Sequence, residues 1–248
     1  MKKFEIVKNI IQTKDNDNIF KHFLNVCRHL SPKFFKKKKF INFSDESLCE
    51  TLIDLKKNNR EVFSNIYKTM QISNEILKIA YINKVQKIAG NFLKFPIKNF
   101  STRNAQFRMD LPFDKENSYG WHQDNAYYNY NVSAKNGVVL WIPLVNTNKS
   151  NGTLIIKPDS YNCDTSASSK KNMKKKNKFS SDQILVKENI LKKFKYEKSV
   201  NINKNNALVT TAGIFHRSGI NTSKVCRFVL VVRFNNIFSK DFIYKRQS

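Results

Sequence analysis

The spacing of hydrophobic residues divides the chain near residue 100. Before that point apolar side chains recur every three or four positions, most regularly in residues 47–59 and 72–93, which is the spacing of amphipathic helices. Ser47, with Glu50 three residues later, is typical of a helix N-terminus. We therefore expect residues 1–100 to be mostly helical, with their apolar faces buried in an ordinary core.

After about residue 105 the hydrophobic period shortens to that of strands. The run AQFRMDL (105–111) alternates, and GVVLWIPLV (137–145) is almost wholly apolar. Further short runs follow between Asn-rich turns: GTLIIKP, SVNI, ALVTT and RFVLVVRF. Many short strands after a helical half are typical of an α+β fold in which helices cover a β barrel or sandwich.

One segment shows neither pattern. Residues 163–181, CDTSASSKKNMKKKNKFSS, are rich in Ser, Lys and Asn, and Met173 and Phe179 are their only large apolar residues. Such a composition buries too little apolar surface to fold alone, so we expect a mobile surface insertion at about 162–182. It would be either a passive basic loop or a lid whose lysines attract an acidic substrate.

The net charge of +26 favours nucleic acid as a partner, but the distribution of the charge does not. Residues 101–160 carry six Lys and Arg against five Asp and Glu, so the excess lies in the two flanks. The chain is also rich in Asn, Ile and Phe, so part of the basic character reflects a general bias in composition. A solvated basic surface explains the charge without any partner.

Several features indicate the cellular setting. No apolar run approaches the roughly 18 residues that a membrane span needs, and the opening FEIVKNII is a poor signal peptide. The four cysteines form no CxxC pair. We therefore expect reduced thiols, a cytoplasmic location and no membrane span.

A small polar group within an aromatic stretch is the first candidate for chemistry. In GWHQDNAYYNY (120–130), His122 and Asp124 are two residues apart and would face the same side of a strand. Alone, this pair is equally well a core histidine hydrogen-bonded to a carboxylate. His216, which ends an apolar strand before a Gly and Asn turn, offers a third ligand. Two imidazoles and one carboxylate in a His-x-Asp…His pattern suit non-haem Fe(II) and leave coordination positions open.

A basic residue in an apolar strand extends this set. Arg227 follows His216 by 11 residues and is surrounded by Val and Phe. A buried guanidinium must pair with an anion, and its planar fork suits a carboxylate. A dicarboxylate co-substrate would provide that partner. Cys226, adjacent on the strand, is expected to face the opposite way as a small core residue.

These residues lie in motifs that resemble the phytanoyl-CoA dioxygenase family of Fe(II)/2-oxoglutarate-dependent oxygenases. The resemblance covers residues 105–235 and rests on WHQDNAYY, WIPLVNTNKSNGTLIIKPDSY and HRSGINTSKVCRF. The middle motif of the family, W-x-x-L…N-G-x-L-x-x-x-P-G-S-H, is matched by Trp141, Leu144, Asn151, Gly152, Leu154, Pro158 and Ser160. The last motif is matched by His216, Ser218, Asn221, Ser223 and Arg227. The sequence departs at Asp159 and Tyr161, where the family usually has Gly and His, which puts the shape of that loop in doubt.

The resemblance implies a fold and a catalytic apparatus. It implies a double-stranded β-helix (a jelly-roll, cupin-like barrel) in residues 101–248, with the helices of residues 1–100 packed outside. It implies Fe(II), with 2-oxoglutarate and O2 as co-substrates and succinate and CO2 as products. The implied iron ligands are His122, Asp124 and His216, and the implied 2-oxoglutarate residues are Arg227, Ser218 and Trp141. A carboxylate at position 124 favours hydroxylation, because halogenases of the family have a small residue there.

The substrate is read from residues that flank the first motif. Those singled out are Gln106, Arg108, Tyr127 and Tyr128. An arginine with several tyrosines suits a small polar or anionic molecule or a glycan precursor, although the same residues could form an ordinary polar strand surface. The alternative function is a basic protein that binds or modifies nucleic acid on the same barrel. His22 and His29 lie in the helical half and are given no role.

Overall fold

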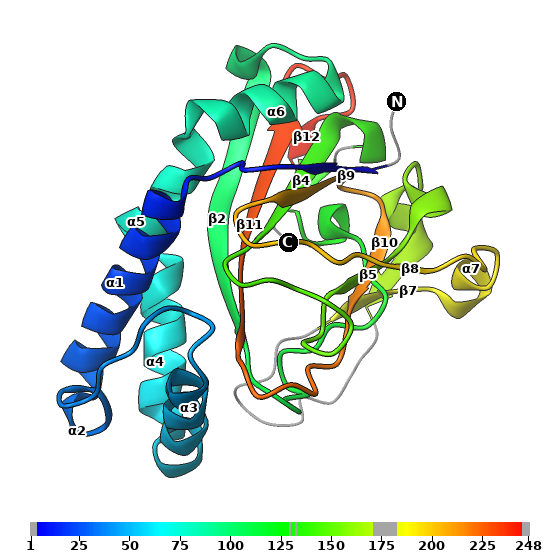
Figure 1. The fold of residues 1–248 in the computed structure, drawn as a ribbon. Coiled ribbons are helices and arrows are strands. Elements are labelled where there is room, and N and C mark those ends of the chain that lie inside the picture. Colours follow the sequence, from blue (N-terminus) through cyan, green and yellow to red (C-terminus); the bar gives the residue numbers. More distant parts are fainter. Residues whose placement is uncertain (1–3, 129, 132, 171–182, 245–248) are drawn as a thin grey trace.

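The computed structural model describes residues 4–128, 130–131, 133–170 and 183–244 (Figure 1). Its centre is a five-stranded antiparallel sheet in the order β1-β9-β4-β11-β2. The strands are β1 (Phe4–Val7), β2 (Phe100–Asp110), β4 (Gly137–Pro143), β9 (Ala207–Thr211) and β11 (Arg227–Asn236). This major sheet faces a minor sheet whose order is β10-β5-β8, formed by β5 (Leu154–Lys157), β8 (Lys198–Ser199) and β10 (Phe215–Ser218). Two short pairs complete the strands: β3 (Tyr130–Asn131) with β12 (Ile243–Tyr244), and β6 (Ser168–Lys170) with β7 (Ile184–Val186).

The helices lie on the outer face of the major sheet (Figure 1). They are α1 (Thr13–Leu30), α2 (Pro32–Phe35), α3 (Glu46–Asn58), α4 (Arg60–Gln71), α5 (Asn74–Leu77) and α6 (Asn83–Leu93). A further short helix, α7 (Glu188–Leu191), lies beside the minor sheet (Figure 1). The predicted α+β class, with an antiparallel jelly-roll-type core and helices outside, is confirmed, although hydrogen bonds among the described strands do not close the two sheets into one barrel.

Strand β11 shows why the core has two compartments. Its side chains alternate between the faces of the major sheet. Phe228 and Leu230 belong to the hydrophobic core beneath the helices, whereas Val229 and Val231 belong to the core between the two sheets. The Phe228 ring lies 4.5 Å from that of Phe43, so aromatic packing holds the helical layer against the strand.

The N-terminal region is not helical throughout. Residues 4–7 form strand β1, which pairs with β9 at the edge of the major sheet, and the sequence pattern did not predict it. The helix expected to begin at Ser47 begins one residue earlier, because Asp45 is the N-cap and its carboxylate accepts from the Ser47 backbone N–H at 2.9 Å.

The segment expected to be a mobile insertion lies partly outside the described residues. Its described beginning is structured: residues 165–167 form a 3-10 turn, and β6 pairs with β7. The expectation of a loop is therefore wrong for residues 165–170. Six of its lysines were predicted to attract substrate, and of these all but Lys170 lie in the undescribed stretch 171–182.

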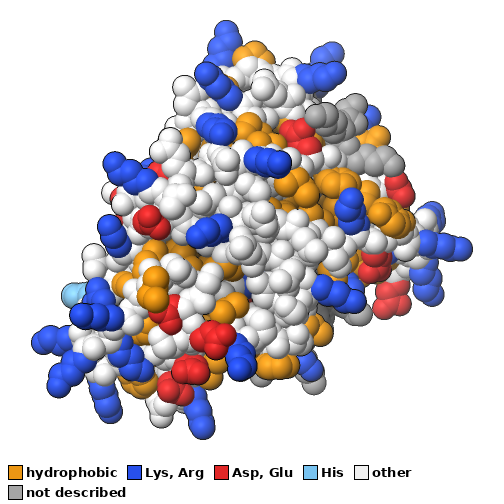
Figure 2. Space-filling view, in the orientation of Figure 1, with side chains coloured by type: hydrophobic (Ala, Val, Ile, Leu, Met, Phe, Trp, Pro, Cys, Tyr) orange, Lys and Arg blue, Asp and Glu red, His pale blue; other side chains and the backbone are white. Residues whose placement is uncertain are grey.

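Basic side chains are scattered over the face shown in Figure 2 and gather most densely at its lower left, where Figure 1 shows α2. Lys33 and the run 36–39 are exposed there. This basic group lies on the helical layer rather than between the sheets. None of the described helices combines the length and the apolar character that a membrane span requires.

Candidate active site

An antiparallel bridge brings the two predicted histidine ligands together. The His122 N–H donates to the His216 carbonyl at 3.0 Å, and the His216 N–H donates back at 3.1 Å. Their ring centroids are 4.1 Å apart. Asp124 begins a one-turn 3-10 helix, η3 (Asp124–Tyr127), so it is not on a strand as expected, but extended backbone at Gln123 still directs it to the same side. One ligand atom from each of His122, Asp124 and His216 lies within 4.8 Å of the others.

Backbone carbonyls fix the tautomer of both imidazoles. His122 Nδ1 lies 2.8 Å from the Gly120 carbonyl oxygen, and His216 Nδ1 lies 3.0 Å from that of Ile214. A carbonyl oxygen only accepts, so Nδ1 of each ring carries the proton. The lone pair of each Nε2 is therefore available to a metal ion.

The protonation states also suit a cation. Burial, with the nearby His216, lowers the pKa of His122 to about 3, and burial also lowers the pKa of His216. Burial alone would raise the pKa of Asp124, but Arg233 and the two histidines bring it down to about 2. At neutral pH the set therefore has two neutral imidazoles and one ionised carboxylate, the forms that bind metals.

The residue between the ligands has a different role. The Gln123 side chain is fully buried, and its Nε2 donates to the Cys163 carbonyl at 2.8 Å and to the Gly213 carbonyl at 3.0 Å. Its Oε1 accepts from the Ser168 hydroxyl at 2.6 Å. Gln123 therefore anchors the beginning of the 163–170 segment beside the site, a role that sequence reasoning missed.

A narrow cavity between the sheets joins the three ligands to the residues predicted to hold 2-oxoglutarate. Ser218, Trp141 and Arg227 all line it. Arg227 is 3% exposed, and its Nη1 atom is buried with no hydrogen-bond partner among the described residues. An unsatisfied buried guanidinium donor is costly, so this atom is suited to receive an incoming carboxylate.

Arg227 already has one anionic partner, which the sequence analysis did not assign. Its Nε and Nη2 lie 3.2 and 2.6 Å from Asp110 Oδ2. The other oxygen of Asp110 accepts from Arg108 Nη2 at 3.0 Å. Burial alone would raise the pKa of Asp110, but the two arginines hold it below its usual range. Asp110 thus orients Arg227 and leaves Nη1 for a ligand.

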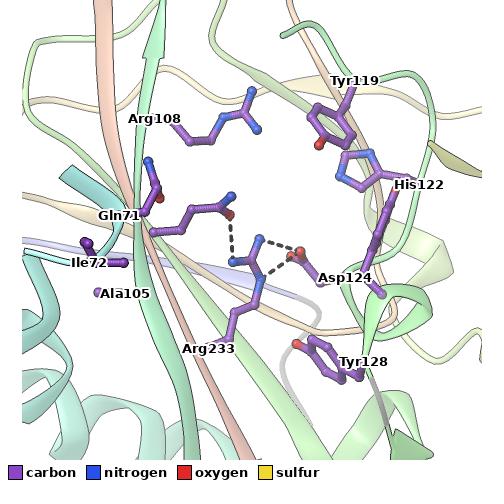
Figure 3. A pocket seen from close by; sticks show the side chains of 11 residues that line it. Gln71, Ile72, Ala105, Arg108, Tyr119, His122, Asp124, Tyr128 and Arg233 are labelled. Carbon is purple, nitrogen blue, oxygen red and sulfur yellow. Dashed lines mark hydrogen bonds and ion pairs between the residues drawn. The ribbon is translucent and has the colours of Figure 1, made fainter. Parts of the chain in front are cut away.

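A wider cavity of about 420 Å³ also reaches His122 and Asp124 (Figure 3). The four residues predicted to bind substrate all line it: Gln106, Arg108, Tyr127 and Tyr128. Sequence reasoning missed Gln71 and Tyr119, which also line it. Gln71 ends α4, and its amide bonds both backbone groups of Phe107, so the helical layer supplies part of the cavity wall.

Arg233 is the most informative residue that was missed. Its Nε and Nη2 lie 2.8 and 2.7 Å from Asp124 Oδ1. A signal for it existed, because residues 227 and 233 are an even number apart on one strand and share a face.

The two other histidines stay outside the site, and His22 instead contacts the Ser73 hydroxyl at 2.7 Å.

Comparisons with known proteins match the sequence to a family profile and the fold to solved structures. The sequence profile of the phytanoyl-CoA dioxygenase (PhyH) family matches residues 36–229. None of the curated proteins matches the sequence.

Solved structures with a similar fold include the epimerase SnoN in complex with Fe3+, alpha ketoglutarate and nogalamycin RO, with a TM-score of 0.58, 9% identity, and coverage of 95% of this chain and 79% of that chain. The alpha ketoglutarate-dependent carbocyclase SnoK from nogalamycin biosynthesis has a TM-score of 0.57, 10% identity, and coverage of 95% and 80%. EvdO2 from Micromonospora carbonacea var. aurantiaca, complexed with 2-oxoglutarate, has a TM-score of 0.50, 16% identity, and coverage of 70% of this chain and 64% of that chain. The chain thus covers less than two thirds of EvdO2, and at these identities the likeness shows the fold alone.

Proposed function

The chain belongs to the phytanoyl-CoA dioxygenase family of 2-oxoglutarate-dependent oxygenases, and we propose that it hydroxylates an unactivated C–H bond of a small polar or anionic molecule. The observation that supports this best is the buried set of His122, Asp124 and His216, whose members line two cavities. One cavity has the size and polarity of a substrate site, and the other ends at the unpaired donor of Arg227.

The residues present fit an iron site. His122 and His216 offer Nε2, and Asp124 offers Oδ2, which lies 3.7 Å from His216 Nε2. Bonds of about 2.0–2.2 Å allow two donors of one cation to be at most about 4.4 Å apart, so both atoms can reach the same ion. Iron(II), when bound, supplies O2 activation coupled to the oxidative decarboxylation of 2-oxoglutarate to succinate and CO2.

The chain's own residues bind and orient the co-substrate. Arg227 Nη1 would donate to the far carboxylate of 2-oxoglutarate, with Trp141 as a wall of the cavity. The Ser218 hydroxyl accepts from the Tyr119 backbone N–H at 3.2 Å, so its own proton can be donated to the same carboxylate.

The wider cavity suggests the class of substrate. The Arg108 guanidinium lies 5.1 Å from the centre of the Tyr119 ring, which holds it over the cavity. Tyr127 is also fixed, because its hydroxyl accepts from the Ile184 backbone N–H at 2.8 Å. An immobilised arginine among tyrosines suits an anionic or sugar-like group.

Anaerobic addition of Fe(II) and then 2-oxoglutarate tests the assignment. We expect a weak visible charge-transfer band and, once O2 is admitted, slow succinate formation without added substrate. His122→Ala, Asp124→Ala and His216→Ala should each abolish both signals. His29→Ala is the matched control, because His29 is exposed on α1. Full turnover by a ligand variant with normal iron content would contradict the metal assignment.

A panel of metabolites then tests the substrate class. Substrates should stimulate succinate formation, and acids or phosphates should do so better than neutral molecules of the same shape. Hydroxylation adds one oxygen atom to the product, epimerisation leaves the mass unchanged, and ring closure removes two hydrogen atoms. Product mass therefore decides the reaction type, and a product without added oxygen would refute the proposed hydroxylation.

A further inference from the structure

We propose that Arg233 is a positioning residue that fixes the Asp124 carboxylate so that only Oδ2 is offered to the metal ion. The inference rests on the proposed function, because it takes Asp124 as a metal ligand. Arg233 Nε donates to the oxygen Oδ1 at 2.8 Å, and Nη2 forms an ion pair with the same oxygen at 2.7 Å (Figure 3). Both groups are largely buried, with side-chain exposures of 16% for Arg233 and 6% for Asp124.

The bonds to Arg233 decide how Asp124 can bind. A carboxylate can coordinate an ion through one oxygen or through both. Here Oδ1 accepts a charge-assisted hydrogen bond from Nε and is ion-paired with Nη2, whereas Oδ2 lies 3.7 Å from His216 Nε2. Two-oxygen coordination would break those bonds and would occupy a position that 2-oxoglutarate or O2 needs. Arg233 therefore keeps the coordination sphere open.

The support for Arg233 comes from the sheet rather than from the loop that contains Asp124. Strand β11 is hydrogen-bonded to β4 on one side and to β2 on the other. Asp124, in contrast, begins a single 3-10 turn. The guanidinium of Arg233 therefore links the Asp124 carboxylate, which lies in a connecting segment, to a central strand of the major sheet. Such hydrogen bonds behind a metal ligand hold it in one orientation.

Gln106 completes the support. Its Oε1 accepts from Arg233 Nη1 at 3.1 Å, so all three nitrogen atoms of the guanidinium have partners. The register between β11 and β2 shifts at this point: Val231 lies opposite Gln106, but Arg233 lies opposite Arg103. Such irregularities redirect side chains. Gln106 was predicted to bind substrate, and its bond to Arg233 indicates that it also acts through the metal site.

Cobalt(II) is a suitable probe, because its visible absorption reports both affinity and coordination geometry without turnover. We would titrate the wild-type protein, Arg233→Met and Arg233→Lys with Co(II) under argon. Arg217→Met is the matched control, because Arg217 adjoins His216 in sequence but has a side chain 35% exposed and 3.5 Å from Glu197. Arg233→Met should weaken Co(II) binding about 10- to 100-fold and change the shape of the spectrum. Arg233→Lys, which keeps the charge but has a single donor nitrogen, should be intermediate.

The outcomes separate a positioning role from a structural one. If Arg233 merely stabilises the fold, Arg233→Met will lower the melting temperature of the metal-free protein and leave the Co(II) affinity and spectrum unchanged, which overturns the proposal. If Arg233→Met does not fold, Gln106→Leu serves instead, since it removes one support of the guanidinium and should shift the spectrum in the same direction. A wild-type protein that binds no Co(II) would overturn the proposed function and this inference together. Normal binding that is indifferent to position 233 would overturn this inference alone.

Discussion

Replacing Arg227 by Met tests the co-substrate site and the role of Asp110 at once. Methionine keeps much of the side-chain length but removes the charge and every donor. The variant loses the bond from Nη1 to the 2-oxoglutarate carboxylate, and a hydrogen bond to a charged group contributes about 1.5–3 kcal/mol. It also uncovers the buried carboxylate of Asp110, which loses the 2.6 Å contact from Nη2 and then repels the incoming ligand. Together these effects should cost on the order of 3 kcal/mol or more, which is over about 100-fold in the dissociation constant.

The measurement is the anaerobic affinity of the iron-loaded protein for 2-oxoglutarate, read from the charge-transfer band. The double variant Arg227→Met with Asp110→Asn separates the two effects, since it lacks the donor but also lacks the repelling charge. We expect the double variant to regain about tenfold of the lost affinity. Unchanged affinity in the single variant would refute the assignment of Arg227, and equal affinity in both variants would show that Asp110 does not influence the ligand.

Three further predictions concern the stability and chemistry of the chain. Phe228→Ala should lower the free energy of unfolding by about 3–5 kcal/mol in urea titrations, because its fully buried ring packs against the helical layer. A small disulfide oxidant should join Cys49 and Cys226, whose sulfur atoms are 2.9 Å apart, and mass spectrometry should show the loss of two hydrogen atoms. The reaction should be faster at higher pH because burial raises the pKa of Cys226, and Cys49→Ser should abolish it. The free energy of unfolding of the metal-free protein should fall as the pH is lowered from about 6.5 toward 3, and His122 should contribute up to about 1.4 kcal/mol per pH unit. The reason is that the folded-state pKa of His122 is about 3, so the unfolded chain binds the proton first; in His122→Asn the free energy should fall less steeply with pH.

The sequence predicted those parts of the fold whose period is regular and those parts of the site that lie in short motifs. The run RFVLVVRF lies in β11, where successive side chains point alternately to two buried faces of the major sheet. Strand β1 was missed because four residues of edge strand, three of them only half-buried, have little pattern of their own.

The missed site residues share a physical cause. Gln71 lies at the end of a helix, far along the chain from the motifs, and only packing of that helix on β2 brings it to the cavity. Arg233 and Asp110 act by pairing with other side chains of the protein, and such pairs depend on the register between strands. The spacing of residues 227 and 233 indicates a shared face of β11, but no spacing within one segment encodes the register that decides the pairing.

The balance of charge in the two cavities bears on the substrate. Among the described side chains, three arginines line them (Arg108, Arg227 and Arg233), and two carboxylates face these arginines (Asp110 and Asp124). A divalent cation and doubly charged 2-oxoglutarate would cancel each other, so the loaded site would keep the excess of one positive charge. In a buried site an uncompensated charge is unfavourable, and a substrate that brings one negative group would remove it. Arg108 is the arginine placed to meet that group, because both other guanidinium groups hold a carboxylate with two nitrogen atoms each, whereas Arg108 offers Asp110 only Nη2. Charge balance and geometry therefore both favour an anionic substrate.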